Sequence, residues 1–278
     1  MNTVSPALFP LRHFAFEPWM KIVRTGVAAA LLATPAMADT IWNQTGDQTW
    51  PPTKLWSEPT NWTGGVPDAE DANTYINLGT VLIDTEVGTI QRLHVQGSTT
   101  VTGTSGVWIA SGGKLTLETV GSNTGILYVR TGRKSDQRVM VESGGTLNVS
   151  GISMSRSGSA TEGTSLFTNW GAISVSGNAT VETDKARFEM KGGSMSVGGS
   201  LTVGATSTPL DGAFYSQTGG VLNVTSNLEL QPGAVVEVSG GSITGSNWLY
   251  FNQGAADRAG TTFHVLGSGA TSIQFSSL

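Results

Sequence analysis

The stretch FEMKGGSMSVGGSLTVG, residues 188–204, decides the fold of this chain. It spells Gly-Gly, then small and apolar residues in alternation, and then repeats the pattern at once. Alternation with a period of two is typical of a β-strand with one buried face. Glycine turns the chain between such strands because it adopts positive φ at no steric cost. The stretch therefore predicts short strands separated by tight corners.

The Gly-Gly pattern recurs along the chain in six segments that align without gaps. These segments are SGGKLTL (111–117), SGGTLNV (143–149), NWGAISV (169–175), KGGSMSV (191–197), TGGVLNV (218–224) and SGGSITG (239–245). Their starts lie 32, 26, 22, 27 and 21 residues apart. Periods of this size indicate stacked supersecondary units rather than a single central core.

Each unit contains three predicted strands. The first carries the inward apolar positions Leu115, Leu147, Ile173, Met195, Leu222 and Ile243. A second strand follows after a short Gly-, Ser- or Asn-rich turn, and a third precedes the next Gly-Gly. The prediction is an all-β, single-stranded parallel β-helix, a solenoid with about three short strands per coil, over residues 79–250. We expect a right-handed coil because connections between parallel strands favour that hand.

The segments outside the coils are assigned by composition. Residues 1–38 resemble a signal peptide, with Ala36 and Ala38 forming an A-x-A cleavage site and Met20 as a second candidate start. Residues 39–78 form a Trp-rich segment that we expect to cap the exposed end of the solenoid. Residues 251–278 are predicted to begin a C-terminal β segment that is incomplete at Leu278.

Charge and composition exclude several classes of function. Residues 39–278 hold all but one of the 20 acidic residues and all but three of the 15 basic ones, a net charge near −7. This balance disfavours nucleic acid or an anionic membrane as partner. The chain has no cysteine and, beyond residue 38, no stretch predicted to form a transmembrane helix. We expect an exported protein, at the cell surface or extracellular, without disulfides.

The length variation between units falls mainly between the second and third strands, so these loops are predicted to line up at one corner. We name this corner the ledge. Its charged residues are a candidate site for an anionic glycan or a protein partner, with solubility as the alternative role. They are Arg130, Arg133, Lys134, Asp136, Arg156, Asp184, Lys185 and Asp211.

Two further candidate sites lie in the N-terminal segment. Trp50, Trp56 and Trp62 could form an aromatic platform for sugar rings, although covering the end of the core is the favoured role. Asp68, Glu70 and Asp71 are the one tight acidic group; calcium binding and a plain polar loop stay open.

Chemistry-bearing motifs are otherwise missing from the sequence. His94 and His264 lie far apart, without partners at metal-ligand spacing, and no nucleophile elbow or phosphate loop is present. We predict no catalytic residue, no metal and no cofactor.

The N-terminal block W…W…NWTGGVPDAEDANTYI, followed by G-x-L-x-V coils, resembles bacterial exported proteins with autotransporter-associated β-strand repeats, many of them of the PEP-CTERM type. The closing GTTFHVLGSGATSIQFSSL is also similar to the segment after the coils in such proteins. The resemblance implies a surface or matrix protein without known catalytic residues. The sorting tail and the outer-membrane barrel of these families are missing, which suggests a C-terminally truncated sequence.

The expected function is therefore structural or adhesive. A rigid rod that presents stacked loops and a polar face suits weak multivalent contacts with extracellular polysaccharide or other surface proteins. The alternatives are a β-helical polysaccharide lyase or glycoside hydrolase, and a passenger fragment of an autotransporter.

Overall fold

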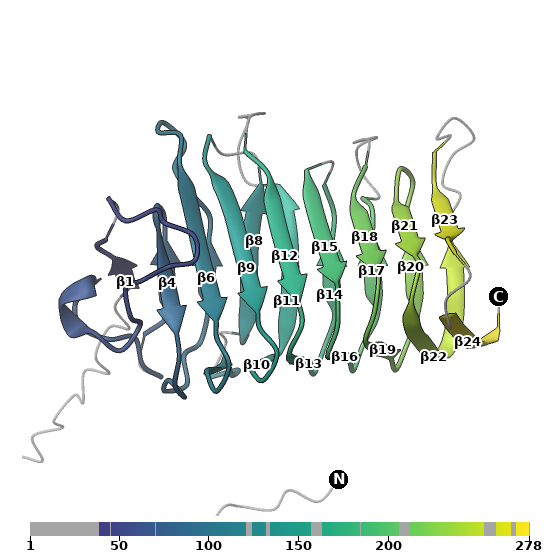
Figure 1. Ribbon diagram of the computed structural model, residues 1–278, viewed down its shortest axis with the longest axis horizontal. Coiled ribbons are helices and arrows are strands. Elements are labelled where there is room, and N and C mark those ends of the chain that lie inside the picture. Colours follow the sequence, from purple (N-terminus) through teal and green to yellow (C-terminus); the bar gives the residue numbers. More distant parts are fainter. Residues whose placement is uncertain are drawn as a thin grey trace, which may run out of the picture. The chain divides into compact units, whose positions relative to one another are not determined.

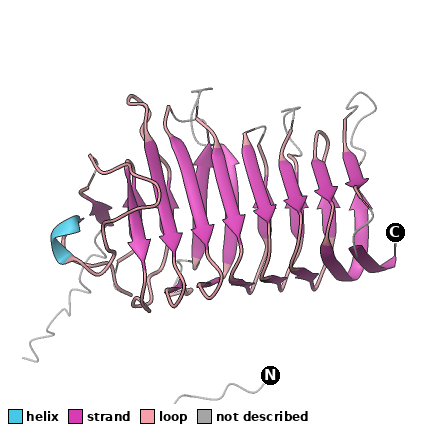
Figure 2. Ribbon diagram, viewed as in Figure 1, coloured by secondary structure: helices cyan, strands magenta, loops and turns pink. Residues whose placement is uncertain are grey.

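The computed structural model describes residues 39–44, 46–69, 71–120, 124–131, 134–156, 163–183, 185–205, 212–252, 260–267 and 271–277. The chain separates into two compact units, residues 1–36 and 37–278, and every described residue lies in the second. The described residues form strands and turns, with one short 3-10 helix (η1, Pro59–Asn61) and no α-helix (Figure 2). In this part of the chain no helix is long and apolar enough to cross a membrane. The predicted all-β class is confirmed.

The strands stack in three sets, which we name faces A, B and C. Face A holds β1 (Asp39–Trp42), β3 (Asn73–Ile76), β5 (Leu93–Val95), β8 (Ile126–Thr131), β11 (Gly151–Arg156), β14 (Ala179–Val181), β17 (Leu201–Val203), β20 (Leu228–Leu230) and the second half of β22 (Gly241–Phe251). Strand β2 (Trp62–Thr63) pairs with β1 and is antiparallel to it.

Faces B and C complete each coil. Face B holds β4 (Gly79–Ile83), β6 (Thr104–Ile109), β9 (Asp136–Val141), β12 (Ser165–Asn169), β15 (Ala186–Met190), β18 (Phe214–Gln217), β21 (Val235–Val238) and β23 (Thr262–Val265). Face C holds β7 (Lys114–Thr116), β10 (Thr146–Val149), β13 (Ala172–Val175), β16 (Ser194–Val197), β19 (Val221–Val224), the first half of β22, and β24 (Thr271–Ser277).

The chain visits faces C, A and B in turn, so each strand pairs in parallel with the strand one coil away. In Figure 1 face B lies in front, face A behind it and face C along the bottom. Long parallel sheets built in this way are compatible with the predicted solenoid. From β5 onward, most of the long connections run from face A to face B, as expected for the ledge, and the connection from β7 to β8 is also long.

The register follows the alternation of the sequence. On face C, Leu147 pairs with Leu115 on one side and Ile173 on the other, and Met195 pairs with Leu222. All five side chains are buried. Because adjacent parallel strands lie about 4.8 Å apart, these side chains form a continuous inward column along the coils.

Face B contributes an aromatic column to the core. Phe167, Phe188 and Tyr215 stack on successive strands, with ring centroids 4.6 and 5.8 Å apart and interplanar angles of 18° and 16°. The buried Tyr215 hydroxyl donates to Gln217 Oε1 at 3.0 Å. Asn169 is also fully buried; its Oδ1 accepts from the backbone N–H of Gly171 at 3.0 Å. Face B therefore places polar groups inside the core and satisfies them there.

One glycine shows why the corners need this residue. Gly193, in the opening stretch, has φ +60°, and a Cβ at this position would lie 1.9 Å from the carbonyl oxygen of Gly171 in the preceding coil. Any side chain would force the two coils apart. The Gly-Gly repeat is thus a requirement of the close approach between coils.

Parallel pairing runs past both predicted limits of the coils. Strands β1 and β3, inside residues 39–78, already belong to face A. Beyond residue 250, β23 pairs with β21 and β24 pairs with β22. The reason is that a strand of mixed composition can join a sheet edge whenever its alternate residues fit the core, so composition alone does not mark the end of the stack.

Candidate ligand-binding face

The outer surface of face A carries one continuous row of side chains. Because strands alternate between two sides, the residue between two inward positions points outward in every coil. The register places these residues in line: Ile41, Tyr75, His94, Tyr128, Ser153, Thr180, Thr202, Glu229 and Tyr250. After Ile41 the row is aromatic as far as Tyr128, then hydroxyl-bearing, and it ends with the carboxylate of Glu229 next to the aromatic ring of Tyr250.

The first aromatic end is a closed stack. The ring of His94 lies between those of Tyr75 and Tyr128, 4.7 Å from each, at interplanar angles of 22° and 10°. The guanidinium of Arg130 lies 4.6 Å from the centroid of the Tyr128 ring. Since the rings cover one another's faces, they present mainly their edges to solvent. This stack stabilises face A but offers little flat surface to a ligand.

The His94 ring is held in its neutral form. Burial lowers the pKa of His94 to about 4, and the positive charges of Arg130 and Arg92 act in the same direction. Its Nε2 lies 3.2 Å from Asn73 Oδ1, which can only accept a hydrogen bond, so Nε2 carries the proton. Burial also raises the pKa of Tyr75. Both groups are therefore uncharged over the neutral range.

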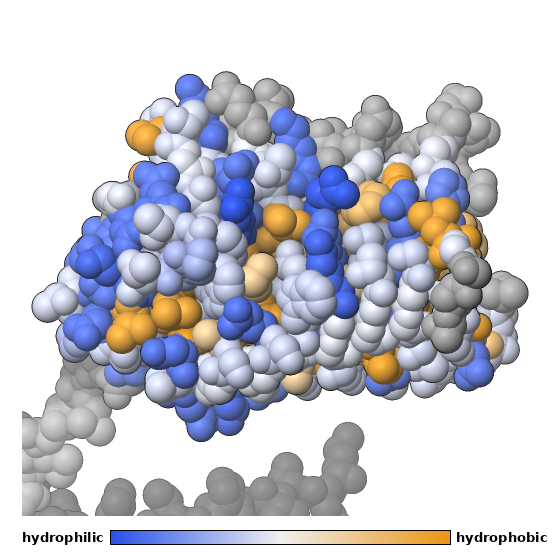
Figure 3. All heavy atoms as spheres, in the orientation of Figure 1, coloured by the Kyte–Doolittle hydropathy of each residue, from blue (hydrophilic) through white to orange (hydrophobic). Residues whose placement is uncertain are grey.

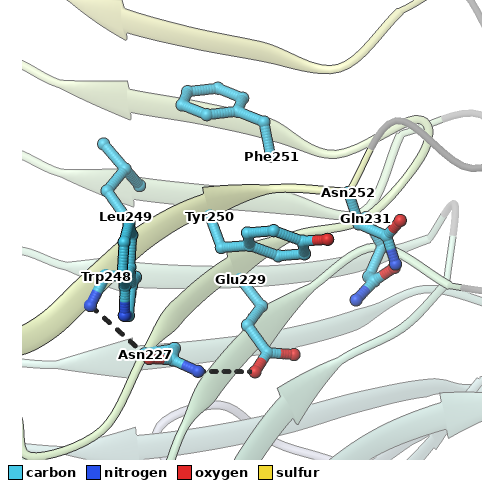
Figure 4. Close-up of a pocket in the computed structure, with 8 residues that line it drawn as sticks. All are labelled: Asn227, Glu229, Gln231, Trp248, Leu249, Tyr250, Phe251 and Asn252. Carbon is cyan, nitrogen blue, oxygen red and sulfur yellow. Dashed lines mark hydrogen bonds between the residues drawn. The ribbon is translucent and has the colours of Figure 1, made fainter. Parts of the chain in front are cut away.

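The second aromatic end forms a groove of about 630 Å³ (Figure 4). Strand β20 and the residues on either side of it supply Asn227, Glu229 and Gln231, and β22 and its continuation supply Trp248 to Asn252. Trp248 and Tyr250 are each 51% exposed. In Figure 4 these two rings extend on the side of Asn227 and Glu229. The groove thus combines two accessible aromatic rings with carboxylate and amide groups.

Alternation within β22 explains why the two rings are accessible. Leu249 pairs with Leu228 at an inward position and is buried, so its neighbours Trp248 and Tyr250 must point outward. Phe251 takes the next inward position, opposite Leu230, yet is 39% exposed. Ser277 of β24 pairs with Trp248, but no described strand pairs with Leu249–Phe251 on the side away from β20.

The polar groups of the groove are oriented by hydrogen bonds. Asn227 Nδ2 donates to Glu229 Oε1 at 3.3 Å, and Thr202 Oγ1 lies 3.5 Å from Glu229 Oε2. The amide of Asn252 donates to Gln231 Oε1 at 2.8 Å. A carboxylate offers about four lone-pair positions, so Glu229 keeps acceptor capacity for a ligand.

The predicted ledge is only partly within the described residues. Arg133, Asp184, Asp211 and the side chain of Arg156 lie outside them. Asp136 accepts hydrogen bonds from the backbone and the hydroxyl of Thr164, both at 2.9 Å, so it closes its own corner. Lys134 is exposed, Lys185 is half-buried, and Arg130 packs on Tyr128. The described members of the ledge do not gather around one site.

The predicted tryptophan platform is not formed. Trp56 and Trp62 are 1% and 3% exposed, with centroids 4.6 Å apart, and Trp62 Nε1 donates to the carbonyl of Trp56 at 2.7 Å. Trp50 packs on Trp108, with centroids 5.1 Å apart. These rings therefore pack against the protein, and the accessible pair of aromatic rings lies at the other end of face A.

The remaining candidates lie only partly within the described residues. The Asp71 carboxylate accepts from the backbone N–H of Asp68 at 3.0 Å, and Glu70 lies outside the described residues. Within the described part of the chain, no group of three His, Asp or Glu side chains could hold a metal ion. Ala36 and Ala38 also fall outside it.

The outer surface of face B is mixed in character (Figure 3). Figure 3 shows its apolar side chains in separate patches between hydrophilic ones. On β15 of this face, the carboxylate of Glu189 lies 4.0 Å from Arg187 Nε and 3.1 Å from Lys191 Nζ.

The groove was not foreseen from the sequence, although a signal for it is present. The segment NWLYF, residues 247–251, places two aromatic residues at outward positions once the inward Leu249 is recognised.

No protein-family model, no curated protein and no solved structure matches this chain.

Proposed function

We propose that this chain is an exported, non-enzymatic β-helical protein of the cell surface or extracellular matrix, with a structural and adhesive role. Its ligand is extracellular polysaccharide, which binds to face A at the groove of Trp248 and Tyr250. The observation that carries the proposal is the pair of accessible aromatic rings beside oriented carboxylate and amide groups.

The chemistry of the groove matches that of a sugar. The apolar C–H face of a pyranose ring packs on an aromatic face, and tryptophan and tyrosine combine large apolar area with a polar tip. Sugar hydroxyls need acceptors and donors at the same place, and Glu229, Gln231 and Asn252 supply them. An open groove also admits an internal segment of a polymer, so many weak contacts along a polysaccharide add up.

The finer features of the fold are part of the same proposal. We infer a right-handed coil, because right-handed connections between parallel strands are strongly favoured. We also infer that the Trp-rich N-terminal segment caps the solenoid; the burial of Trp42, Trp56 and Trp62 beside β1 supports it. An experimental structure with a left-handed coil would overturn the first inference. The second would be overturned if a variant lacking residues 39–63 unfolded no more readily than the full chain.

Affinity electrophoresis against a panel of neutral, basic and acidic polysaccharides tests the proposed binding. We expect retardation by at least one polysaccharide, and Trp248→Ala should weaken the binding about tenfold, because one stacking ring contributes on the order of 1–2 kcal/mol. The matched control is Trp170→Ala: Trp170 is 45% exposed but lies outside face A. Equal effects of the two substitutions, or no binding to any polysaccharide, would contradict the proposal.

The same mixtures distinguish binding from hydrolysis. Glycosidases of the common type need two carboxyl groups across the bond that they cleave. Of the described residues that line the groove, Glu229 alone carries a carboxylate. We therefore expect no release of reducing ends from a polysaccharide that binds.

A further inference from the structure

We propose that the groove selects glycans that carry free amino groups, so that a protonated sugar amine pairs with the carboxylate of Glu229 between Trp248 and Tyr250. This inference rests on the proposed polysaccharide binding and adds the class of ligand. A site that bound only neutral sugars would need hydrogen-bonding groups but no net charge. Here a negative charge stands among accessible aromatic rings.

The position of Glu229 supports this assignment. It pairs with Tyr250 on the adjacent strand, about 4.8 Å away along face A, while Asn227 lies beside Trp248. Hydrogen bonds from Asn227 and Thr202 fix the carboxylate in place without neutralising its charge. Among the described residues that line the groove, none is Lys, Arg or His, so none of them competes with a ligand cation for this carboxylate.

The surroundings favour a cation for two further reasons. An ammonium group close to the face of a tryptophan or tyrosine ring is attracted by the ring's quadrupole. The net charge near −7 of residues 39–278 also attracts polycations and repels acidic polysaccharides. A sugar with a free amine can use its C–H face on a ring and its charge on Glu229 at once. An N-acetylated sugar keeps the first contact and loses the second.

Two oligosaccharides of the same backbone isolate this charge. The hexamer of β-1,4-linked glucosamine and its fully N-acetylated counterpart are titrated into the protein by calorimetry, at low salt and at a pH where the amines are protonated. We expect the amino form to bind at least threefold more tightly, the range of a partly exposed ion pair, and raised salt to reduce this preference. Glu229→Gln, which preserves the shape but removes the charge and exchanges one acceptor oxygen for an N–H donor, should abolish the preference, so that the two hexamers bind equally to this variant.

The outcomes separate the inference from the function on which it rests. Equal binding of the two hexamers, or an unchanged preference in Glu229→Gln, overturns the amine assignment but leaves polysaccharide binding intact. The amine assignment is also overturned if neither hexamer binds but a neutral polysaccharide retains the protein and Trp248→Ala abolishes that retention. Polysaccharide binding then stands. Failure to bind any glycan overturns the proposed function as well. Glu237→Gln, at an outward position on face B, is the matched control and should change neither titration.

Discussion

Replacing Phe188 by alanine tests the register on which the whole description depends. Phe188 is 1% exposed, and its ring lies between those of Phe167 and Tyr215, with centroids 4.6 and 5.8 Å away. Truncating a buried phenylalanine costs about 3–5 kcal/mol, and the loss of two ring pairs places this site in the upper half of the range. We expect Phe188→Ala to lower the free energy of unfolding by about 4 kcal/mol.

Phe214 supplies the control for this substitution. It is half-buried on the outer side of face B, where the Arg187 guanidinium lies 4.3 Å from its ring centroid. Phe214→Ala should therefore cost less than about 1 kcal/mol. A register shifted by one residue would exchange the two sides and reverse this order.

Urea unfolding followed by circular dichroism measures both variants, and hydrogen exchange locates the damage. Because a solenoid's stability sums contacts between neighbouring coils, amide protection should fall first in β12, β15 and β18, the strands that carry the aromatic column. Equal losses for the two variants, or a larger loss for Phe214→Ala, would refute the assigned register. Protection lost evenly along the chain would refute the nearest-neighbour reasoning.

Two further predictions concern the corners and the closed aromatic stack. Gly193→Ala should lower the free energy of unfolding, measured in urea, by more than about 2 kcal/mol, because it combines a positive φ with a contact to the Gly171 carbonyl. Gly88→Ala, with open space around it, should change this free energy little. Equal effects of the two substitutions would contradict the close approach of the coils. For His94, the folded pKa of about 4 lies below the unfolded value of about 6.5, so the unfolded chain takes up the proton first as the pH falls. The resulting stability is fully present above pH 6.5 and is lost progressively toward pH 4, by up to about 3 kcal/mol. Urea unfolding across this range should show a smaller pH dependence for His94→Gln than for the unaltered chain, and identical profiles would be evidence against a buried, neutral ring.

The sequence predicts most of the coil geometry because the repeat encodes it locally. Gly-Gly marks a corner, and the residues at the second and fourth positions after it fill the core, as Met195 and Val197 do. Face B is less predictable. Asn169 and Gln217 are polar, yet both occupy inward positions, and their side-chain N–H groups donate to carbonyl oxygens of the next coil. Those partners lie about 25 residues away in sequence, where no local pattern can show them.

The predicted tryptophan platform was wrong for a related reason. Tryptophan is equally suited to filling a core and to stacking on a ligand, and the choice depends on what covers the ring. Trp56 and Trp62 have β1 and β2 around them, whereas Trp248 stands on the outer side of face A. The sequence contains both sets of residues but not the neighbours that decide their exposure.

The groove also owes its position to an irregularity in the repeat. In earlier coils a turn separates the strand on face C from the strand on face A, but β22 runs from Gly241 to Phe251 without a break and belongs to both. It is therefore held on face C by β19 and β24 and on face A by β20. A strand fixed in this way cannot rotate to hide Trp248 and Tyr250 in the core without breaking pairing on both faces. The two rings are thus preorganised beside Glu229, which reduces the ordering cost that a weak glycan site would otherwise carry.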